Sequence, residues 1–212
     1  MTANSSAKRY VIAADLGTTS TKTLVIDRDG RVVAGHSIEY PMHTPTPDRA
    51  EQDPLEIFAA VVRGIKEVIA KAAISGSDVL CVSFSSAMHS LIAVDREFHP
   101  LTACITWADN RSVDCVAPLK EQWNGLGIYR NTGTPIHPMS PLLKLMWMNR
   151  HEPELVSRTH KFIGIKEFVF AKLFGCCVID YSLASATGLF NLRRLDWDEE
   201  ALRVAGVSRE QL

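Results

Sequence analysis

The chain has 212 residues, with 23 Lys and Arg against 24 Asp and Glu, which leaves a formal net charge of -1 at pH 7. Hydrophobic residues make up 46% of it and charged residues 22%, a composition that supports a sizeable core and excludes a disordered chain. The balanced charge argues against nucleic-acid binding, and no apolar stretch approaches the roughly 18 residues of a membrane span, so no membrane partner is expected.

The first part of the chain predicts an antiparallel meander of three strands. Residues 1–9 are small and polar and are expected to form a disordered tail. Apolar and β-prone runs at 10–14, 21–26 and 31–40 predict the strands, and an Asp-Gly pair at 29–30 indicates a hairpin turn between the last two. A loop is expected between the first two strands.

The remainder of the chain alternates helices and strands. Asp53 as a cap, Pro54 at the first helical position and Glu56 three residues after the cap predict a helix over 54–73, whose apolar residues recur at helical spacing. Further strands are expected at 79–85, 90–94, 103–107, 177–181 and 188–192, and further helices at 113–123, 141–149, 166–174 and 198–205. The alternation predicts a mixed α/β sheet, and the composition shows no break that would divide residues 10–212 into two domains.

The five cysteines show no CxxC pair and no zinc-ligand spacing. Free thiols of this kind favour a reducing, cytoplasmic location. Cys81 lies in an apolar run and is expected to be buried. The adjacent Cys176 and Cys177 are interpreted as small residues at the start of a strand.

The residues between the first two strands form the most informative stretch. A carboxylate leaves the strand, a glycine lets the backbone turn, and hydroxyl residues and a lysine follow, an arrangement that can direct amides and hydroxyls at phosphate oxygens. These residues are Asp15, Gly17, Thr18, Thr19, Ser20, Thr21 and Lys22. A P-loop is excluded, because Thr21 stands where a glycine should precede the lysine and a strand follows instead of a helix. The alternative is a Thr-rich turn with a structural aspartate.

Six separated motifs, spread from about Tyr10 to the end of the chain, resemble the FGGY carbohydrate kinases of the sugar kinase, hexokinase and actin superfamily. They are DLGTTS at 15–20, EQDP at 51–54, SAMHS at 86–90, WADNR at 107–111, KLMW at 144–147 with KEF at 166–168, and DYSLAS at 180–185. The resemblance implies a ribonuclease H-like, actin-like ATPase domain. In that fold an antiparallel three-stranded meander and parallel strands form a mixed sheet with helices on both faces.

For the first motif the resemblance implies a site for the phosphates of ATP, with Mg²⁺ as the second cofactor. Asp15 would hold the magnesium through the phosphates, and the phosphate-binding residues would be Gly17, Thr18, Thr19, Ser20 and Lys22. The family carries a second phosphate loop and a glycine-rich adenosine site in a C-terminal domain, and neither motif occurs between residues 192 and 212. We therefore expect a truncated half-enzyme that binds nucleotide poorly and whose partner is the C-terminal domain absent from this chain.

The resemblance also implies a sugar site lined by Met88, His89, Trp107, Asp109, Arg111 and Asp180. Carboxylate and imidazole groups can orient the hydroxyls of a polyol, and an indole supplies a flat apolar wall. Each residue has a structural alternative: His89 closes a turn, Trp107 belongs to the core, and Asp109 forms a surface ion pair with Arg111 that is worth little. Tyr40 is assigned to packing alone.

Asp180 is the expected general base. Phosphoryl transfer to an alcohol has a loose transition state and the proton leaves late, so a carboxylate with an ordinary pKa near ~3.9 can accept it. The structural alternative is an Asx-turn cap before Ser182.

The acceptor is expected to be a sugar acid or a ketose. Residues 177–189 and 195–198 resemble the bacterial gluconokinases of the family, which favours conversion of D-gluconate to 6-phosphogluconate, with D-xylulose as the alternative. Met139 stands where the glycerol kinases of the family carry a tyrosine, which argues against glycerol. A carboxylate substrate favours a nearby arginine, and Arg111 is a candidate that does not decide between the two acceptors.

Two hypotheses from other functional classes remain, a chaperone or filament protein and an inactive fragment. Chaperones and filament proteins share the actin-like architecture, but they need no polyol pocket, so the motifs around Met88 and Trp107 argue against them. The other hypothesis is an inactive fragment that folds and binds sugar without phosphorylating it. A homodimer is left open.

Overall fold

The computed structural model describes residues 9–212 and divides the chain into two compact units. Unit 1 consists of Met1–Pro41 and Leu55–Ser86, and unit 2 consists of Met42–Pro54 and Ala87–Leu212. The composition gave no sign of this division. The tail expected at 1–9 lies outside the described residues except for Arg9.

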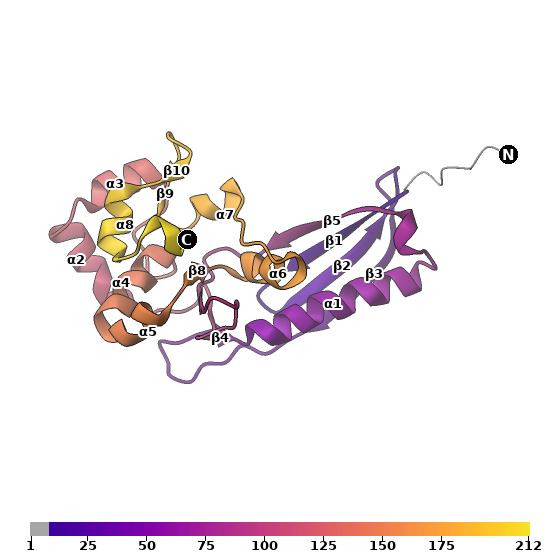
Figure 1. Ribbon diagram of the computed structural model, residues 1–212, viewed down its shortest axis with the longest axis horizontal. Coiled ribbons are helices and arrows are strands. Elements are labelled where there is room, and N and C mark those ends of the chain that lie inside the picture. The colour runs from indigo at the N-terminus through magenta and orange to yellow at the C-terminus, as the bar shows by residue number, and fades with distance from the viewer. Residues whose placement is uncertain (1–8) are drawn as a thin grey trace. The chain divides into compact units, whose positions relative to one another are not determined.

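Unit 1 contains a four-stranded sheet in the order β3-β2-β1-β5 (Figure 1). The strands β1 (Tyr10–Leu16), β2 (Ser20–Ile26) and β3 (Val32–Glu39) are antiparallel neighbours, and β5 (Val79–Ser86) pairs with β1 in parallel. The helix α1 (Pro54–Lys71) begins at the proline that the sequence placed at the first helical position. The predicted meander, the first long helix and the mixed sheet are therefore confirmed, and the short 3-10 helix η1 (Gly76–Asp78) leads into β5.

Alternation along the strands separates the two faces of this sheet. Ile12 and Val25 point to one face and are fully buried with Val68 of α1, which forms the core of unit 1. Asp15 and Lys22 are directly opposite each other in the antiparallel pair and are both exposed on the other face. The core thus fixes the register that places a carboxylate beside an ammonium at the end of the hairpin.

The expectation of a buried thiol at Cys81 is wrong, because this side chain is exposed. β5 is an edge strand of the sheet, and its burial alternates between half-buried and exposed residues. Leu80 is exposed as well. An apolar run alone does not distinguish a strand buried on both faces from an edge strand with an open face.

Unit 2 is built mainly from short helices around α4. Its elements are β4 (Glu51–Gln52), β6 (Ile92–Val94), β7 (Cys104–Ile105), η2 (Val113–Cys115), α2 (Val116–Glu121), α3 (Gly125–Thr132), α4 (Pro141–His151), α5 (Pro153–Arg158), β8 (Lys161–Ile163), α6 (Ile165–Phe174), α7 (Tyr181–Ser185), β9 (Phe190–Asn191), β10 (Asp196–Trp197), α8 (Glu199–Ala205) and η3 (Arg209–Gln211). Strand pairs β4-β7, β6-β8 and β9-β10 are all antiparallel. Leu143, Leu145 and Met148 of α4 are fully buried in one core with Ala201 and Ala205 of α8. No helix among the described residues is long and apolar enough to cross a membrane.

The strand expected at 177–181 is wrong. Residues 177–180 form no regular element, and α7 begins at Tyr181 because the Asp180 side chain accepts hydrogen bonds from the backbone amides of Ser182 (3.0 Å) and Leu183 (3.2 Å). An aspartate in this position satisfies amides that a helix start leaves without partners. The local cap therefore outweighs the β preference of the residues before it.

Candidate functional site

The stretch expected to bind phosphate forms the tight hairpin between β1 and β2. The Gly17 amide donates to the Ser20 carbonyl across 3.0 Å, which closes the turn. A Cβ on Gly17 would lie 3.1 Å from the same carbonyl oxygen, so a larger residue would strain the closure. The close approach of the two backbones thus favours glycine at this position of the motif.

Tyr40 holds this hairpin from within unit 1. Its hydroxyl donates to the Gly17 carbonyl (2.7 Å) and lies 3.3 Å from the Thr21 hydroxyl, and its amide donates to the Thr19 carbonyl (3.2 Å). The side chain is only 7% exposed. The assignment of Tyr40 to packing alone is therefore incomplete, and the sequence carried no local signal for contacts with residues about twenty positions away.

The hairpin offers the groups that a phosphate with its metal requires. Thr18, Thr19 and Ser20 contribute hydroxyls in and beside its turn, and exposed Asp15 and Lys22 lie opposite each other next to that turn. An ammonium and hydroxyls complement phosphate oxygens, and a carboxylate suits a hydrated magnesium ion. The residue types and their shared location thus fit the expected ligand.

His89 lies in unit 2 in a left-handed backbone conformation, with a φ of 66°. Its Nδ1 atom is 2.7 Å from the Ala186 carbonyl, and because a carbonyl only accepts, Nδ1 carries the proton. Burial lowers the pKa of His89, the Ala186 contact opposes this, and the nearby Lys144 and His137 lower it further. A neutral ring with this tautomer leaves Nε2 as an acceptor for a hydroxyl group.

Met88 and Trp107 are the apolar members of the expected sugar site. Met88 is 44% and Trp107 is 49% exposed, so the alternative that places Trp107 in the core is wrong. Large apolar side chains that are left open to solvent are available to cover the C–H face of a sugar. Their exposure is what a binding surface in unit 2 requires.

Asp109 and Arg111 form a buried ion-pair network with Glu51. The guanidinium Nε and Nη2 atoms each lie 2.8 Å from an Asp109 oxygen, and Nη2 also donates to Glu51. Asp109 is fully buried and accepts from the Ala50 amide as well (2.8 Å). The alternative of a surface ion pair is therefore wrong. Both side chains are engaged internally, and their contact with a sugar stays a prediction.

Asp180 is half exposed at the start of α7, and its two oxygens have different partners. Oδ1 accepts the two α7 amides, and Oδ2 lies 2.6 Å from the Lys166 ammonium. Burial opposes ionisation, but the Lys166 hydrogen bond and the amides of Leu183 and Ser182 hold the pKa of this carboxyl below its usual value. The capping alternative for Asp180 is thus observed, and the same geometry keeps an ionised oxygen at the surface.

Contacts within unit 2 join three of the predicted segments. His89 is bound to Ala186, just after α7, which begins beside Asp180. Lys144 donates to the carbonyls of His89 and Thr106, and Thr106 directly precedes Trp107. The motifs at 144–147 and 166–168 supplied no expected site residue, so the sequence did not predict the links made by Lys144 and Lys166. The expected phosphate-binding residues belong to unit 1 and are described separately.

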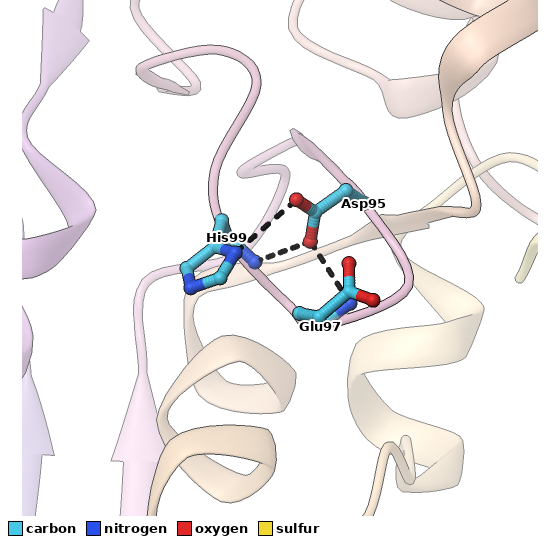
Figure 2. A group of neighbouring side chains, drawn as sticks. All are labelled: Asp95, Glu97 and His99. Atoms are coloured by element: carbon cyan, nitrogen blue, oxygen red, sulfur yellow. Dashed lines mark hydrogen bonds and ion pairs between the residues drawn. The ribbon is translucent and has the colours of Figure 1, made fainter.

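Unit 2 also contains a cluster of titratable side chains in a turn and an apolar cavity. Figure 2 shows Asp95, Glu97 and His99 in a turn, where the Asp95 carboxylate accepts the amides of Glu97 and His99 and contacts His99 Nδ1. The turn's own groups thus account for this arrangement. A cavity of about 130 Å³ is lined mainly by apolar side chains together with Glu167 and Cys177. Glu167 lies over Gly164 at the start of α6, where a Cβ added to Gly164 would lie 2.5 Å from its Oε2, and neither of its carboxylate oxygens has a hydrogen-bond partner among the described residues.

Comparison with known proteins identifies the class. The model of the FGGY family of carbohydrate kinases, N-terminal domain, matches residues 10–212, and the chain belongs to this family. The mixed α/β fold expected for it is confirmed by close similarity to solved sugar kinase structures.

Individual relatives give further detail. A gluconokinase of Bacillus subtilis (strain 168) is 50% identical over 203 residues, which cover 96% of this chain and 39% of the relative. The structures of a gluconate kinase and of a ligand-bound xylulose kinase, both from Lactobacillus acidophilus, are each 41% identical with a TM-score of 0.91, and the match covers 96% of this chain and 41% of theirs. The chain therefore spans about 40% of the length of these relatives.

Proposed function

We propose that this chain is the acceptor-binding part of an ATP-dependent kinase that phosphorylates the primary hydroxyl of D-gluconate to give 6-phosphogluconate. The 50% identity to a gluconokinase supports the acceptor. The observation that carries the chemistry is the half-exposed, ionised Asp180 carboxylate, held in the segment to which His89 is also bound. Turnover is proposed to require the C-terminal domain of the family as partner. A cytoplasmic location and a homodimer stay predictions.

Asp180 would act as the general base through Oδ2. The α7 amides fix Oδ1, so the carboxylate is oriented before the substrate arrives. A hydroxyl that displaces the Lys166 ammonium from Oδ2 could pass its proton to this oxygen as the phosphoryl group is transferred. The low pKa suits a loose transition state, in which little nucleophile deprotonation is needed until late.

The remaining sugar contacts would come from the other predicted residues of unit 2. His89 Nε2 would accept a sugar hydroxyl, and Trp107 and Met88 would cover the C–H surface. Asp109 and Arg111 would contribute by fixing the loop that carries Trp107, since their charged groups are already bound to each other and to Glu51.

Unit 1 would supply the nucleotide side. Gly17, Thr18, Thr19, Ser20 and Lys22 would contact phosphate oxygens, and Asp15 would hold Mg²⁺ through the phosphates. When bound, ATP would supply the phosphoryl group and Mg²⁺ would offset the negative charge of the phosphates. Tyr40 would keep the hairpin in shape for this contact, as its two hydrogen bonds to the turn suggest.

D-Xylulose is the second candidate acceptor, favoured by the 41% identical structure of a xylulose kinase. The state of Arg111 also bears on the choice. Because Asp109 and Glu51 already neutralise this buried guanidinium, it offers no ready cation for the carboxylate of gluconate. An inactive sugar-binding fragment is the third candidate for the chain by itself.

A chimera tests the proposal. Residues 10–212 are joined to the part of the Bacillus subtilis gluconokinase that lies beyond the matched region, and ADP release is measured with D-gluconate and D-xylulose. We expect turnover of gluconate, and Asp180→Asn should lower kcat at least 100-fold while sugar binding by calorimetry persists. Asp29→Asn, in an exposed turn of unit 1, is the control. Near-normal turnover in Asp180→Asn would reject the base, and turnover of xylulose alone would replace the acceptor.

A further inference from the structure

Lys144 of α4 is a fully buried lysine whose partners are both uncharged. Its ammonium donates to the His89 carbonyl across 2.6 Å and to the Thr106 carbonyl across 2.7 Å. Among the ion pairs of the described residues, none includes Lys144. A buried cation without a directly bound carboxylate is unfavourable, so its presence requires an explanation.

The two carbonyls belong to the segments that carry the expected sugar-binding side chains. His89 provides one itself, and Thr106 directly precedes Trp107. His89 has the strained φ of 66°, a conformation that persists only where several contacts hold it. Two hydrogen bonds contribute to holding it, the Lys144 bond to its carbonyl and the Ala186 bond to its ring.

Packing does not account for an amine at this position. A methionine would fill a similar volume in the core around α4 without the desolvation penalty. Burial lowers the pKa of Lys144 to about 7, against the opposing effects of Asp109 and Cys104, while Arg111 lowers it further. Both the charged and the neutral amine have at least two N–H bonds, so either form can bind both carbonyls.

We infer that Lys144 is a positioning residue that sets the spacing between the His89 turn and the Trp107 loop, so that both side chains contact the sugar together. The inference rests on the proposed function of these two segments. Loss of the amine would let each segment relax independently and would weaken sugar binding. The nucleotide side, which is assigned to unit 1, would be unaffected.

The test uses the chimera with Lys144→Met and Lys144→Ala, and Lys120→Met on the exposed face of α2 as the matched control. We expect the KM for sugar to rise at least tenfold in both Lys144 variants, with a smaller change in kcat and an unchanged KM for ATP. Lys120→Met should leave all three constants as they are. A sugar KM within twofold of the parent in a folded Lys144→Met chimera would overturn the inference.

Chemical rescue separates positioning from simple cavity filling. Lys144→Ala removes three carbons and the amine, which n-propylamine replaces, whereas propan-1-ol has the same length but a single donor. We expect propylamine to lower the sugar KM towards the parent value and propanol to have little effect. Equal rescue by both compounds would mean that only volume matters and would overturn the inference. A parent chimera that phosphorylates neither sugar would instead reject the proposed function.

The 212-residue chain itself gives a readout that needs no turnover. Hydrogen exchange of the amides at 88–90 and 106–108 should become at least tenfold faster in Lys144→Ala and should slow again with propylamine. Unchanged exchange in that variant would show that the amine does not hold these segments and would overturn the inference, whatever the sugar assays give.

Discussion

Replacement of Glu167 by glutamine is expected to change how the stability of the chain depends on pH. Glu167 is the third residue of α6 and only 3% exposed. Neither of its carboxylate oxygens has a hydrogen-bond partner among the described residues. Burial raises the pKa of this carboxyl to about 7, and the Asp180 charge adds to the effect. The amides of Glu167 and Gly164 and the Lys166 charge oppose it without reversing it.

The size and sign of the effect follow from this shift. A carboxyl with a pKa of about 7 in the folded chain and 4.5 in the unfolded chain binds a proton more tightly when folded. Its contribution is fully present below pH 4.5 and is lost as the pH rises to 7. At about 1.4 kcal/mol per pKa unit, the loss is on the order of 3 kcal/mol. Lys144, with pKa values of about 7 folded and 10.5 unfolded, begins to lose its proton in the folded chain near pH 7, but it is present in the parent and in the variant alike, so its contribution cancels in the difference between them.

The measurement is the free energy of unfolding in urea at pH 4, 5, 6, 7 and 8. Relative to the parent, Glu167→Gln should gain stability steadily between pH 4.5 and 7 and hold that gain above pH 7. Glu154→Gln, which changes an exposed carboxyl of α5, is the matched control and should follow the parent curve. A difference between Glu167→Gln and the parent that stays constant from pH 4 to pH 8 would refute the reasoning.

Two further substitutions test the contacts that hold each unit. Tyr40→Phe removes the hydroxyl bond to Gly17 and should lower the free energy of unfolding by about 1 kcal/mol, with faster exchange of the hairpin amides; unchanged exchange would contradict the bracing role. Arg111→Met leaves the buried Asp109 without its ion-pair partner. This change should lower the free energy of unfolding in urea by about 3 to 5 kcal/mol. The control Arg209→Met breaks the exposed ion pairs with Asp196 and Glu199 and should change the free energy of unfolding much less, and equal losses in the two variants would argue against a buried network.

The fold of unit 1 could be predicted well from sequence because its signals are local. The Asp-Gly turn at 29–30 fixes the hairpin of β2 and β3 within a few residues. The alternation along β1 and β2 fixes the register in which these two strands pair. The start of α1 follows from Asp53 and Pro54 in the same way. Where the signal was equally local but weaker, as in the short α3 with Gly125 and Gly127, the helix was missed.

Contacts between distant residues could not be predicted in this way. The Asp109 and Arg111 pair is close in sequence, but its burial depends on Glu51, which is sixty positions away from the arginine. Cys81 was expected inside because its neighbours are apolar, and only the strand pairing, which sets it beside Val11, shows that it lies on the sheet face opposite the core residue Ile12. Residue type thus identified the candidate groups, while their state of burial and pairing needed the fold.

The same limit explains why the contacts of Tyr40 and Lys144 were not predicted from the motifs. A residue that contacts a substrate needs a chemical type suited to that substrate, so Asp180 and His89 could be proposed from the residue types in their motifs. A residue that positions another acts through backbone carbonyls, and any carbonyl in the chain can serve as that acceptor. Tyr40 binds Gly17 and Lys144 binds His89 in this manner, each across a long sequence separation. Because backbone acceptors carry no sequence signature, positioning residues of this kind are found from buried polar side chains whose only partners are the backbone of a candidate site.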